Sequence, residues 1–279
     1  MKKISVITGG HGGMGKAIAR ELGKETAIFL GDVNEEELKR VKVDLEETGI
    51  EVYIYVLDVT DAENVEGFAS MAKELGEVVN VINTAGVSPA LCNAQQIYKV
   101  NSIGTVNITE AFYKVISQGG VMINFGSVAA YQTDTDPEWI DVYEQYMNPD
   151  FYEKLMQFVA PLDFDEFLQA GNAYAISKRF VIYYTQKNVE RFYGKGARIL
   201  SVSPGSYLTP MHQALLDNQP DMAEDQLDLI PAGRWGHPYE IASLVHFLCS
   251  KGASYIAGVD ILADGGQISS LFVPQVSLK

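Results

Sequence analysis

The stretch TGGHGGMGKA, residues 8–17, follows a short apolar run and is rich in glycine. It fits three overlapping phosphate-binding patterns. One is G-x-G-x-x-G beginning at Gly10, the second is a near match to a P-loop that ends at Gly15-Lys16, and the third is T-G-x-x-x-G-x-G beginning at Thr8. The correct pattern decides whether the chain binds a nucleoside triphosphate or a dinucleotide, and with it the kind of fold.

The residue after Lys16 argues against a triphosphate. A P-loop needs Ser or Thr directly after its lysine as a Mg²⁺ ligand, and Ala17 stands there instead. A glycine turn between a strand and a helix also lets a pyrophosphate reach the backbone N–H groups at the helix N-terminus. A dinucleotide is therefore favoured.

Asp32 indicates which dinucleotide binds. It ends the second apolar run, about 20 residues after the glycines, where a carboxylate can accept hydrogen bonds from both hydroxyls of an adenosine ribose. Asp32 could instead cap the helix that begins in NEEELKRV. A 2′-phosphate would be repelled by this carboxylate, and neither Met14 nor Val33 offers a cation to hold one. We therefore predict NAD rather than NADP.

The composition is typical of one large α/β domain that spans residues 1–279, since 47% of the residues are hydrophobic. A net charge of −15 disfavours nucleic acids and anionic membranes as partners, because both would be repelled. The first apolar run is too short for a signal peptide, and no run approaches the roughly 20 residues that span a bilayer. Cys92 and Cys249 lack C-x-x-C spacing, which suggests a reducing compartment without excluding one disulfide. We expect a cytoplasmic protein.

Short runs rich in Val and Ile alternate with longer amphipathic segments, a pattern typical of a parallel sheet covered on both faces. Seven runs are expected to be strands: 3–8, 26–31, 51–57, 78–83, 120–126, 197–203 and 258–263. The alternation predicts an α/β fold with a doubly wound parallel seven-stranded sheet, the Rossmann fold.

One segment, about 131–171, interrupts this alternation with acidic and aromatic residues. Asp136-Pro137 is a typical helix start, and large apolar side chains follow at helical spacing. Disordered segments lack so many large apolar side chains. We predict a helical insertion of two or three short helices before the helix that carries Tyr174.

Eight short motifs follow one another along the chain. They are TGGHGGMG at 8–15, LDVT at 57–60, NTAG at 83–86, NSIG at 101–104, INFGS at 123–127, YAISK at 174–178, SPGSYLT at 203–209 and ILADGG at 261–266. Together they resemble the short-chain dehydrogenase/reductase family over nearly the whole chain. The glycine turn is then best aligned from Thr8, with Gly9, Gly13 and Gly15 as its informative glycines.

Tyr174 and Lys178 are four residues apart, so on a helix they project from the same face. A free tyrosine loses its proton only at a pH of about 10, and a nearby ammonium is expected to lower that pKa into the range of general acid/base catalysis. Tyr and Lys at this spacing are common on helices. It is the ordered set of motifs that makes the pair significant.

The resemblance implies four catalytic residues. Tyr174 would pass a proton to or from the substrate oxygen while hydride moves between the substrate carbon and the nicotinamide, and Lys178 would also bond the nicotinamide ribose. Ser127 would orient the carbonyl or alcohol, although a serine at a strand end is more often a turn residue. Asn101 resembles the helix asparagine whose backbone holds a water chain behind the lysine; the alternative is a polar packing residue.

The resemblance also implies the cofactor contacts. The cofactor-binding residues are Thr8, Gly9, His11, Gly13, Met14, Gly15, Asp32, Asp58, Val59, Asn83, Ala85, Gly86, Tyr174, Lys178, Pro204, Gly205, Tyr207 and Thr209. Tyr207 is bulkier than the usual aliphatic residue and is expected to narrow the substrate pocket. The four histidines show no ligand spacing, so we expect no metal site.

The segment between NTAG and Asn101 is short, and the segment from Ser127 to Tyr174 is long. This combination of spacings resembles the bacterial 3α-hydroxysteroid dehydrogenase/carbonyl reductase and coniferyl-alcohol dehydrogenase subgroup. Because the insertion begins beside Ser127 and ends beside Tyr174, its aromatic side chains are expected either to wall a pocket for a bulky apolar substrate or merely to pack on the body or another subunit. These side chains are Trp139, Tyr143, Tyr146, Phe151, Phe158 and Phe164.

The resulting prediction is an NAD-dependent oxidoreductase that interconverts a secondary alcohol and a ketone, with a hydroxysteroid or bile acid as one candidate. The alternatives are a dehydrogenase of an aromatic alcohol or polyol, and a dinucleotide-sensing protein without turnover. The four catalytic residues argue against the sensor. The expected partners are a small apolar alcohol or ketone and further copies of the chain, in a homodimer or homotetramer.

Overall fold

Seven parallel strands form one sheet, in the order β3-β2-β1-β4-β5-β6-β7. The computed structural model describes residues 1–132, 136–159, 165–218, 225 and 227–272. The strands are β1 (Lys3–Thr8), β2 (Ala27–Asp32), β3 (Val52–Val56), β4 (Glu77–Asn83), β5 (Val121–Phe125), β6 (Arg198–Pro204) and β7 (Asp260–Ala263). The strand order reverses between β1 and β4, which is the arrangement of a doubly wound sheet. The seven predicted strands and the fold class are confirmed.

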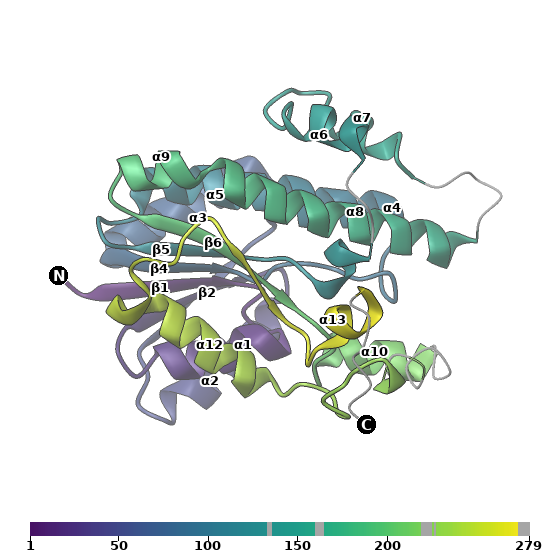
Figure 1. Cartoon of the computed structure of the whole chain (residues 1–279). Helices are drawn as coiled ribbons and strands as arrows, with labels where there is room; N and C mark the ends of the chain where they lie inside the picture. The colour runs from purple at the N-terminus through teal and green to yellow at the C-terminus, as the bar shows by residue number, and fades with distance from the viewer. Residues whose placement is uncertain (133–135, 160–164, 219–224, 226, 273–279) are drawn as a thin grey trace.

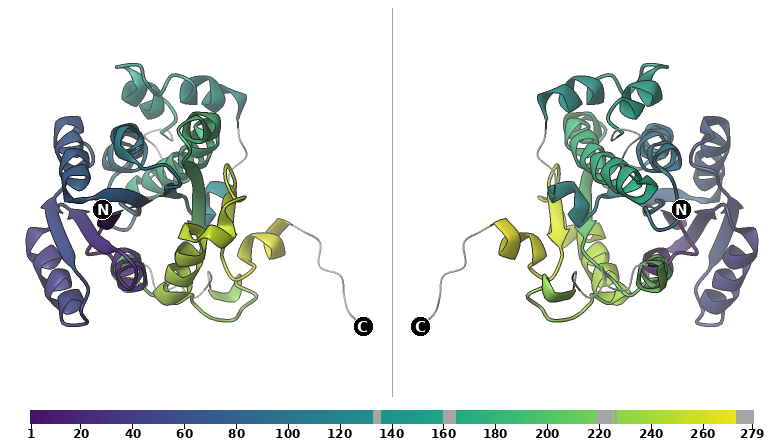
Figure 2. Two further views of the ribbon diagram at one scale, coloured as in Figure 1. Left: turned by 90° about the vertical axis from the view of Figure 1, so that its left-hand side faces the viewer. Right: turned by 90° about the vertical axis from the view of Figure 1, so that its right-hand side faces the viewer.

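Helices cover both faces of the sheet (Figures 1 and 2). One face carries α1 (Gly13–Leu22), α2 (Glu35–Glu46) and α12 (Pro238–Cys249), and the other carries α3 (Ala62–Leu75), α5 (Gly104–Val115), α8 (Glu166–Lys187) and α9 (Val189–Gly194). The shorter helices are α4 (Ala94–Ile97), the π-helix η1 (Tyr98–Ile103), η2 (Val128–Tyr131), α6 (Pro137–Tyr143), α7 (Phe151–Met156), α10 (Pro210–Asn218), η3 (Lys251–Ala253) and α13 (Gln267–Phe272). Among the helices in the described ranges, none is long and apolar enough to cross a membrane. Cys92 and Cys249 are free thiols.

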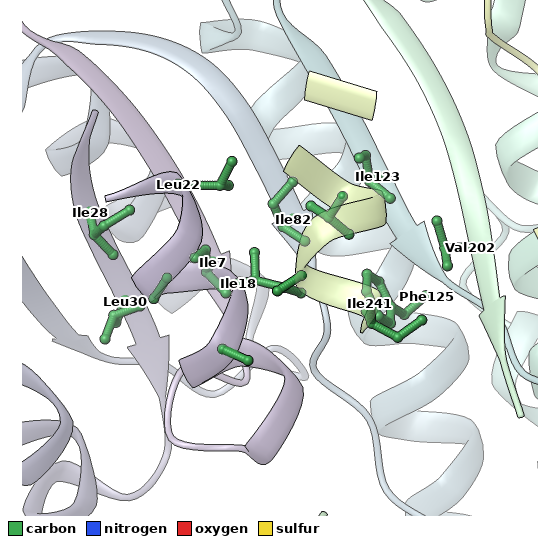
Figure 3. Packing of buried hydrophobic residues seen from close by; sticks show 14 of the residues in the cluster. Ile7, Ile18, Leu22, Ile28, Leu30, Ile82, Ile123, Phe125, Val202 and Ile241 are labelled. Atoms are coloured by element: carbon green, nitrogen blue, oxygen red, sulfur yellow. The ribbon is translucent and has the colours of Figure 1, made fainter. Parts of the chain in front are cut away.

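Apolar side chains attach α1 and α12 to the sheet (Figure 3). Ile18 of α1 and Ile241 of α12 are fully buried in one cluster with the strand residues Ile82 and Ile123. Burial of a side chain of this size contributes about 1.5–3 kcal/mol. This packing holds the start of α1 at the carboxyl edge of the sheet, where ligands bind in doubly wound folds.

The predicted insertion contains two helices, α6 and α7, which lie outside α8 (Figure 1). α6 begins as predicted, since Asp136 accepts a hydrogen bond from a backbone N–H of the first turn and Pro137 follows it. Tyr143 of α6 and Phe151 of α7 are buried against Phe180 of α8, with ring centroids 5.1 Å apart in each pair. The insertion is therefore attached to the body through α8.

Candidate active site

The side chains of Ser127, Tyr174 and Lys178 lie on the wall of one cavity of about 390 Å³. The same wall contains Gly86, which follows β4, and Gly205, which follows β6. These segments meet because parallel strands end at the same edge of the sheet. A cavity of this size is in the range that binds small organic ligands.

The hydroxyl groups of Ser127 and Tyr174 are hydrogen-bonded to each other. Ser127 has extended backbone, and its Oγ also accepts a hydrogen bond from the N–H of Ala129 at 3.2 Å. Burial raises the pKa of Tyr174, and the hydrogen bond from Ser127 opposes this rise only in part. The prediction that the pKa of Tyr174 is lowered is therefore wrong. Loss of water around the phenolate raises the pKa by more than the hydrogen bond with Ser127 lowers it.

Lys178 lies one helical turn after Tyr174, with its Nζ 5.8 Å from the centroid of the tyrosine ring. The two side chains share a face of α8, as their spacing predicts. The ammonium donates a hydrogen bond to the carbonyl oxygen of Phe125 at 2.9 Å. Only 6% of Lys178 is exposed, and burial lowers its pKa to about 8. Its charge at neutral pH is therefore maintained against a desolvation cost.

Asn101 lies in the π-helix η1, a conformation that is frequent at functional sites. Its side chain donates to the carbonyl oxygen of Val87 at 3.1 Å and to Ser177 Oγ at 3.2 Å, and accepts from the Val87 N–H at 2.9 Å. A Cβ on Gly86 would lie 3.2 Å from both Asn101 Oδ1 and Lys178 Nζ. The structure thus brings the asparagine next to the lysine. The role of its backbone in holding water stays a prediction.

The glycine turn forms a cradle at the N-terminus of α1. Gly9 has a φ of +65°, which favours glycine, and a Cβ on Gly15 would lie only 2.3 Å from the Gly9 carbonyl oxygen. α1 begins at Gly13, and no described side chain caps its first turn. Its first N–H groups are therefore available to an anion, so the cradle fits the pyrophosphate of a dinucleotide.

Asp32 lies at the end of β2 and is 7% exposed. Its carboxylate accepts a hydrogen bond from the N–H of Asn34 at 3.2 Å and lies 2.7 Å from Nδ1 of His11. The close contact with the Asp32 carboxylate raises the pKa of His11, while burial opposes the rise. The position of Asp32 agrees with a role at the ribose. The contact also places a titratable group, the His11 imidazole, beside Asp32, where the sequence predicted only the uncharged side chains of Met14 and Val33.

Some predicted cofactor residues support the cradle through buried hydrogen bonds. Thr8 Oγ1 donates to Asn83 Oδ1 at 2.7 Å and accepts from the N–H of Ala85 at 3.1 Å, which joins β1 to β4. Both Thr8 and Asn83 are buried. Thr84, which was not predicted as a contact, donates to the carbonyl oxygen of Thr8 at 2.6 Å and lines the cavity.

Asp58 and Val59 lie in the loop after β3. Asp58 is exposed, and its Oδ1 accepts hydrogen bonds from the N–H and hydroxyl of Thr60 at 2.8 and 2.7 Å. Val59 is buried against Gly104, where a Cβ would lie 2.6 Å from its side chain. Their contact with adenine stays a prediction.

The last residue of β6 and the segment after it form another part of the cavity wall: Pro204, Gly205, Tyr207 and Thr209. Tyr207 donates its hydroxyl to the carbonyl oxygen of Ala263 at 3.1 Å, and its ring lies against Gly236. The bulky ring therefore has a fixed position in the wall.

The five described aromatic residues that were predicted to wall the pocket belong to the cluster around α8 and do not line the cavity, whereas Phe167, at the start of α8, does line it. Tyr143 donates its hydroxyl to the carbonyl oxygen of Ile176 at 3.0 Å, and Tyr146 packs edge-on against Tyr184 with ring centroids 4.8 Å apart. The other described aromatic residues in this cluster are Trp139, Phe151 and Phe158. The interpretation of these five as pocket walls is wrong, because α8 offers them an apolar face on its outer side; Phe164 lies outside the described residues.

The polar side chains of the cavity wall that sequence reasoning missed include Ser88, His212 and Gln267. Each has a buried polar atom for which the described part of the chain provides no hydrogen-bond partner. Ser88 lies in the segment after β4, His212 lies in α10, and Gln267 is the first residue of α13. No sequence motif marks any of the three as a site residue. Within the described ranges, no three His, Cys, Asp or Glu side chains are grouped to hold a metal ion.

Two family models match the chain. Residues 3–136 match the model described as short chain dehydrogenase, and residues 163–267 match the model described as enoyl-(acyl carrier protein) reductase. Residues 137–162, which contain α6 and α7, lie between the two matches.

Similar proteins span nearly the whole chain. The short-chain dehydrogenase/reductase bsc3 of Alternaria brassicicola is 31% identical over 275 residues, which cover 97% of this chain and 98% of the relative. The 2,5-dichloro-2,5-cyclohexadiene-1,4-diol dehydrogenase LinX of Sphingobium indicum is 30% identical over 276 residues and 95% of each chain. Levodione reductase, a solved structure, has a TM-score of 0.77 at 25% identity over 96% of this chain and 98% of that one. An actinorhodin polyketide ketoreductase with NADPH has a TM-score of 0.74 at 22% identity, over 95% and 97%.

Proposed function

Since the chain belongs to the short-chain dehydrogenase/reductase family, we propose that it is an NAD-dependent oxidoreductase that interconverts a secondary alcohol and a ketone. The observation that carries the proposal is that Ser127, Tyr174 and Lys178 share the wall of a cavity that reaches the glycine turn at Met14. The chemistry that a nicotinamide dinucleotide supplies in such a site is hydride transfer.

The side chains of the protein handle the proton. The Ser127 hydroxyl, which already bonds Tyr174, can hold the substrate oxygen beside the phenol. In oxidation the Tyr174 phenolate would take the proton of the substrate hydroxyl, and in reduction the phenol would return a proton to the carbonyl oxygen. The hydride would pass from the substrate carbon to a bound nicotinamide in the first direction and return from it in the second. Lys178 Nζ lies 5.8 Å from the centroid of the Tyr174 ring, and a positive charge beside a phenol favours the phenolate.

The preference for NAD is supported by Asp32, whose carboxylate would repel a 2′-phosphate. We expect Asp32→Ser to lower kcat/KM with NAD about 10- to 100-fold, because a charged hydrogen-bond acceptor is lost, and to lower the ratio of kcat/KM for NAD to that for NADP. Initial rates with both dinucleotides measure the effect. Asp44→Ser is the matched control, since Asp44 lies in α2 and pairs with Lys16 at the surface. An unchanged ratio in Asp32→Ser would contradict the assignment.

His11 makes the preference depend on pH. Contact with Asp32 raises the pKa of His11, so on acidification the imidazole becomes charged and offsets the carboxylate; Glu37 is the other acidic side chain that acts on this ring. The ratio of kcat/KM for NAD to that for NADP should therefore be lower at pH 6 than at pH 8.5. A free 2′-phosphate also gains a proton near pH 6. His11→Gln isolates the contribution of the imidazole, and an identical pH dependence in that variant would argue against it.

A substrate panel tests the proposed function. NADH formation is followed with hydroxysteroids, bile acids, aromatic alcohols, polyols and cyclic secondary alcohols, the last because the name of LinX specifies a cyclic diol. Turnover of secondary alcohols supports the proposal, and turnover of primary aromatic alcohols or polyols alone supports the alternative dehydrogenase. NADH binding without any turnover supports a dinucleotide sensor. The hydroxysteroid assignment rests on the place of the insertion and stays a prediction.

We also propose that the protein forms a homodimer or homotetramer. β7 is an edge strand of the sheet, and beside it Tyr255 is 99% and Val259 is 43% exposed. Large apolar side chains at a sheet edge favour contact with a second copy. Light scattering on the eluted protein measures the mass, and a monomer at all concentrations would contradict the proposal.

A further inference from the structure

Three buried polar atoms of the cavity wall have no hydrogen-bond partner among the described residues, Oγ of Ser88, Nε2 of His212 and Oε1 of Gln267, and the last two belong to the segments that follow β6 and β7. His212 in α10 is 8% exposed, and Gln267 at the start of α13 is 2% exposed. A buried polar atom without a partner destabilises a folded protein and is uncommon. Such atoms in one cavity therefore point to a ligand that completes their hydrogen bonds.

Both residues are carried by well-anchored backbone. The ring of His212 packs edge-on against Trp235, with centroids 4.4 Å apart, and its backbone N–H donates to Thr209 Oγ1 at 3.2 Å. The start of α13 is held by Asp264, whose carboxylate accepts the N–H of Ile268 at 2.8 Å. The ring of His212 and the backbone that carries Gln267 are thus placed before any ligand arrives, as recognition groups usually are.

The chemistry of these atoms limits what they bind. Burial lowers the pKa of His212, so its ring is neutral and Nε2 either donates or accepts one hydrogen bond. The amide oxygen of Gln267 only accepts, so its partner must be a donor. A hydroxyl group satisfies either atom, whereas a ketone or ether oxygen has no proton to donate to Oε1 of Gln267.

The rest of the wall indicates that the ligand hydroxyl bound by His212 and Gln267 is not the hydroxyl that is oxidised. Ser127 and Tyr174 serve the reacting oxygen, and much of the remaining wall is apolar: Met14, Val87, Pro89, Ala90, Phe167 and Met211. In such cavities a few polar groups set orientation and specificity. We propose that His212 and Gln267 recognise a second hydroxyl group of the substrate, which makes the substrate class a diol or hydroxyketone rather than a monofunctional apolar alcohol. The inference rests on the proposed function.

The test compares the oxidation of cyclohexanol with that of cyclohexane-1,2-, 1,3- and 1,4-diol. His212→Phe and Gln267→Met keep similar volumes and remove the hydrogen-bonding atoms, and His212→Gln restores a polar group. We expect kcat/KM of the wild type to be at least about tenfold higher for one diol than for cyclohexanol, and this ratio to fall about tenfold in His212→Phe and in Gln267→Met. His212→Gln should recover part of it. His246→Phe, at a surface contact with Glu25, is the control and should keep the wild-type ratio.

Three results would overturn the inference. The first is a ratio that neither substitution changes, and the second is wild-type turnover confined to monofunctional alcohols in the wider panel; the proposed function survives both. The third is a rise in the dissociation constant for NADH in His212→Phe or Gln267→Met, measured by fluorescence, that is large enough to explain the lost activity. The two side chains would then bind the dinucleotide rather than the substrate. If the wild type binds NADH but oxidises no alcohol, the proposed function fails and the inference fails with it.

Discussion

Tyr174→Phe is expected to lower kcat about 10³-fold and to leave the dissociation constant for NADH close to that of the wild type. The phenol is the group placed to exchange a proton with the substrate oxygen, and a general acid/base contributes roughly 10²- to 10⁴-fold. The variant retains the ring, so packing in α8 is preserved. Steady-state rates with the best alcohol of the panel, together with NADH fluorescence, measure the two effects.

Tyr183→Phe is the matched control for this change. It lies in the same helix, but its hydroxyl bonds Glu144 at the surface. It should retain wild-type kcat. A Tyr174→Phe enzyme with more than a tenth of the wild-type kcat would refute the assignment of Tyr174 as the proton-transfer group.

Lys178→Met is expected to lower kcat about 100-fold or more and, at the same time, to stabilise the folded protein by about 2 kcal/mol at pH 7. Burial lowers the pKa of Lys178 from 10.5 to about 8, which corresponds to a cost of about 3 kcal/mol for keeping the side chain charged. The loss of the hydrogen bond to Phe125 offsets about 1 kcal/mol. Methionine has similar length and needs no hydration, so it fits the same space.

The pH dependence of stability separates this explanation from a simple packing effect. Because the folded-state pKa lies below the unfolded value, the cost of the charge is fully present below pH 8, decreases between pH 8 and 10.5, and is absent above that range. The stability difference between Lys178→Met and the wild type, measured by urea unfolding, should shrink over the same interval. Lys187→Met, at the exposed end of α8, should show no such gain. A Lys178→Met protein less stable than the wild type at pH 7 would contradict the argument.

The sequence determined those features that depend on neighbouring residues. Runs of Val and Ile that alternate with amphipathic segments predicted all seven strands, since a strand covered on both faces needs apolar side chains throughout. Asp136-Pro137 predicted the start of α6 through cap geometry, which involves one helical turn only. Tyr174 and Lys178 were placed on one face by their spacing, which is a local property of the helix.

Only the tertiary structure decided which groups meet and how much water they lose. Burial, and not the nearby ammonium, determines the direction in which the pKa of Tyr174 moves, and desolvation depends on every segment that surrounds the ring. The aromatic side chains of α6 and α7 pack toward α8 rather than into the cavity, although their helical spacing is compatible with either. His11 reaches Asp32, and His212 and Gln267 reach the cavity, through contacts between segments that are distant along the chain. Periodicity and motif spacing describe local geometry, so they carry no information about such contacts.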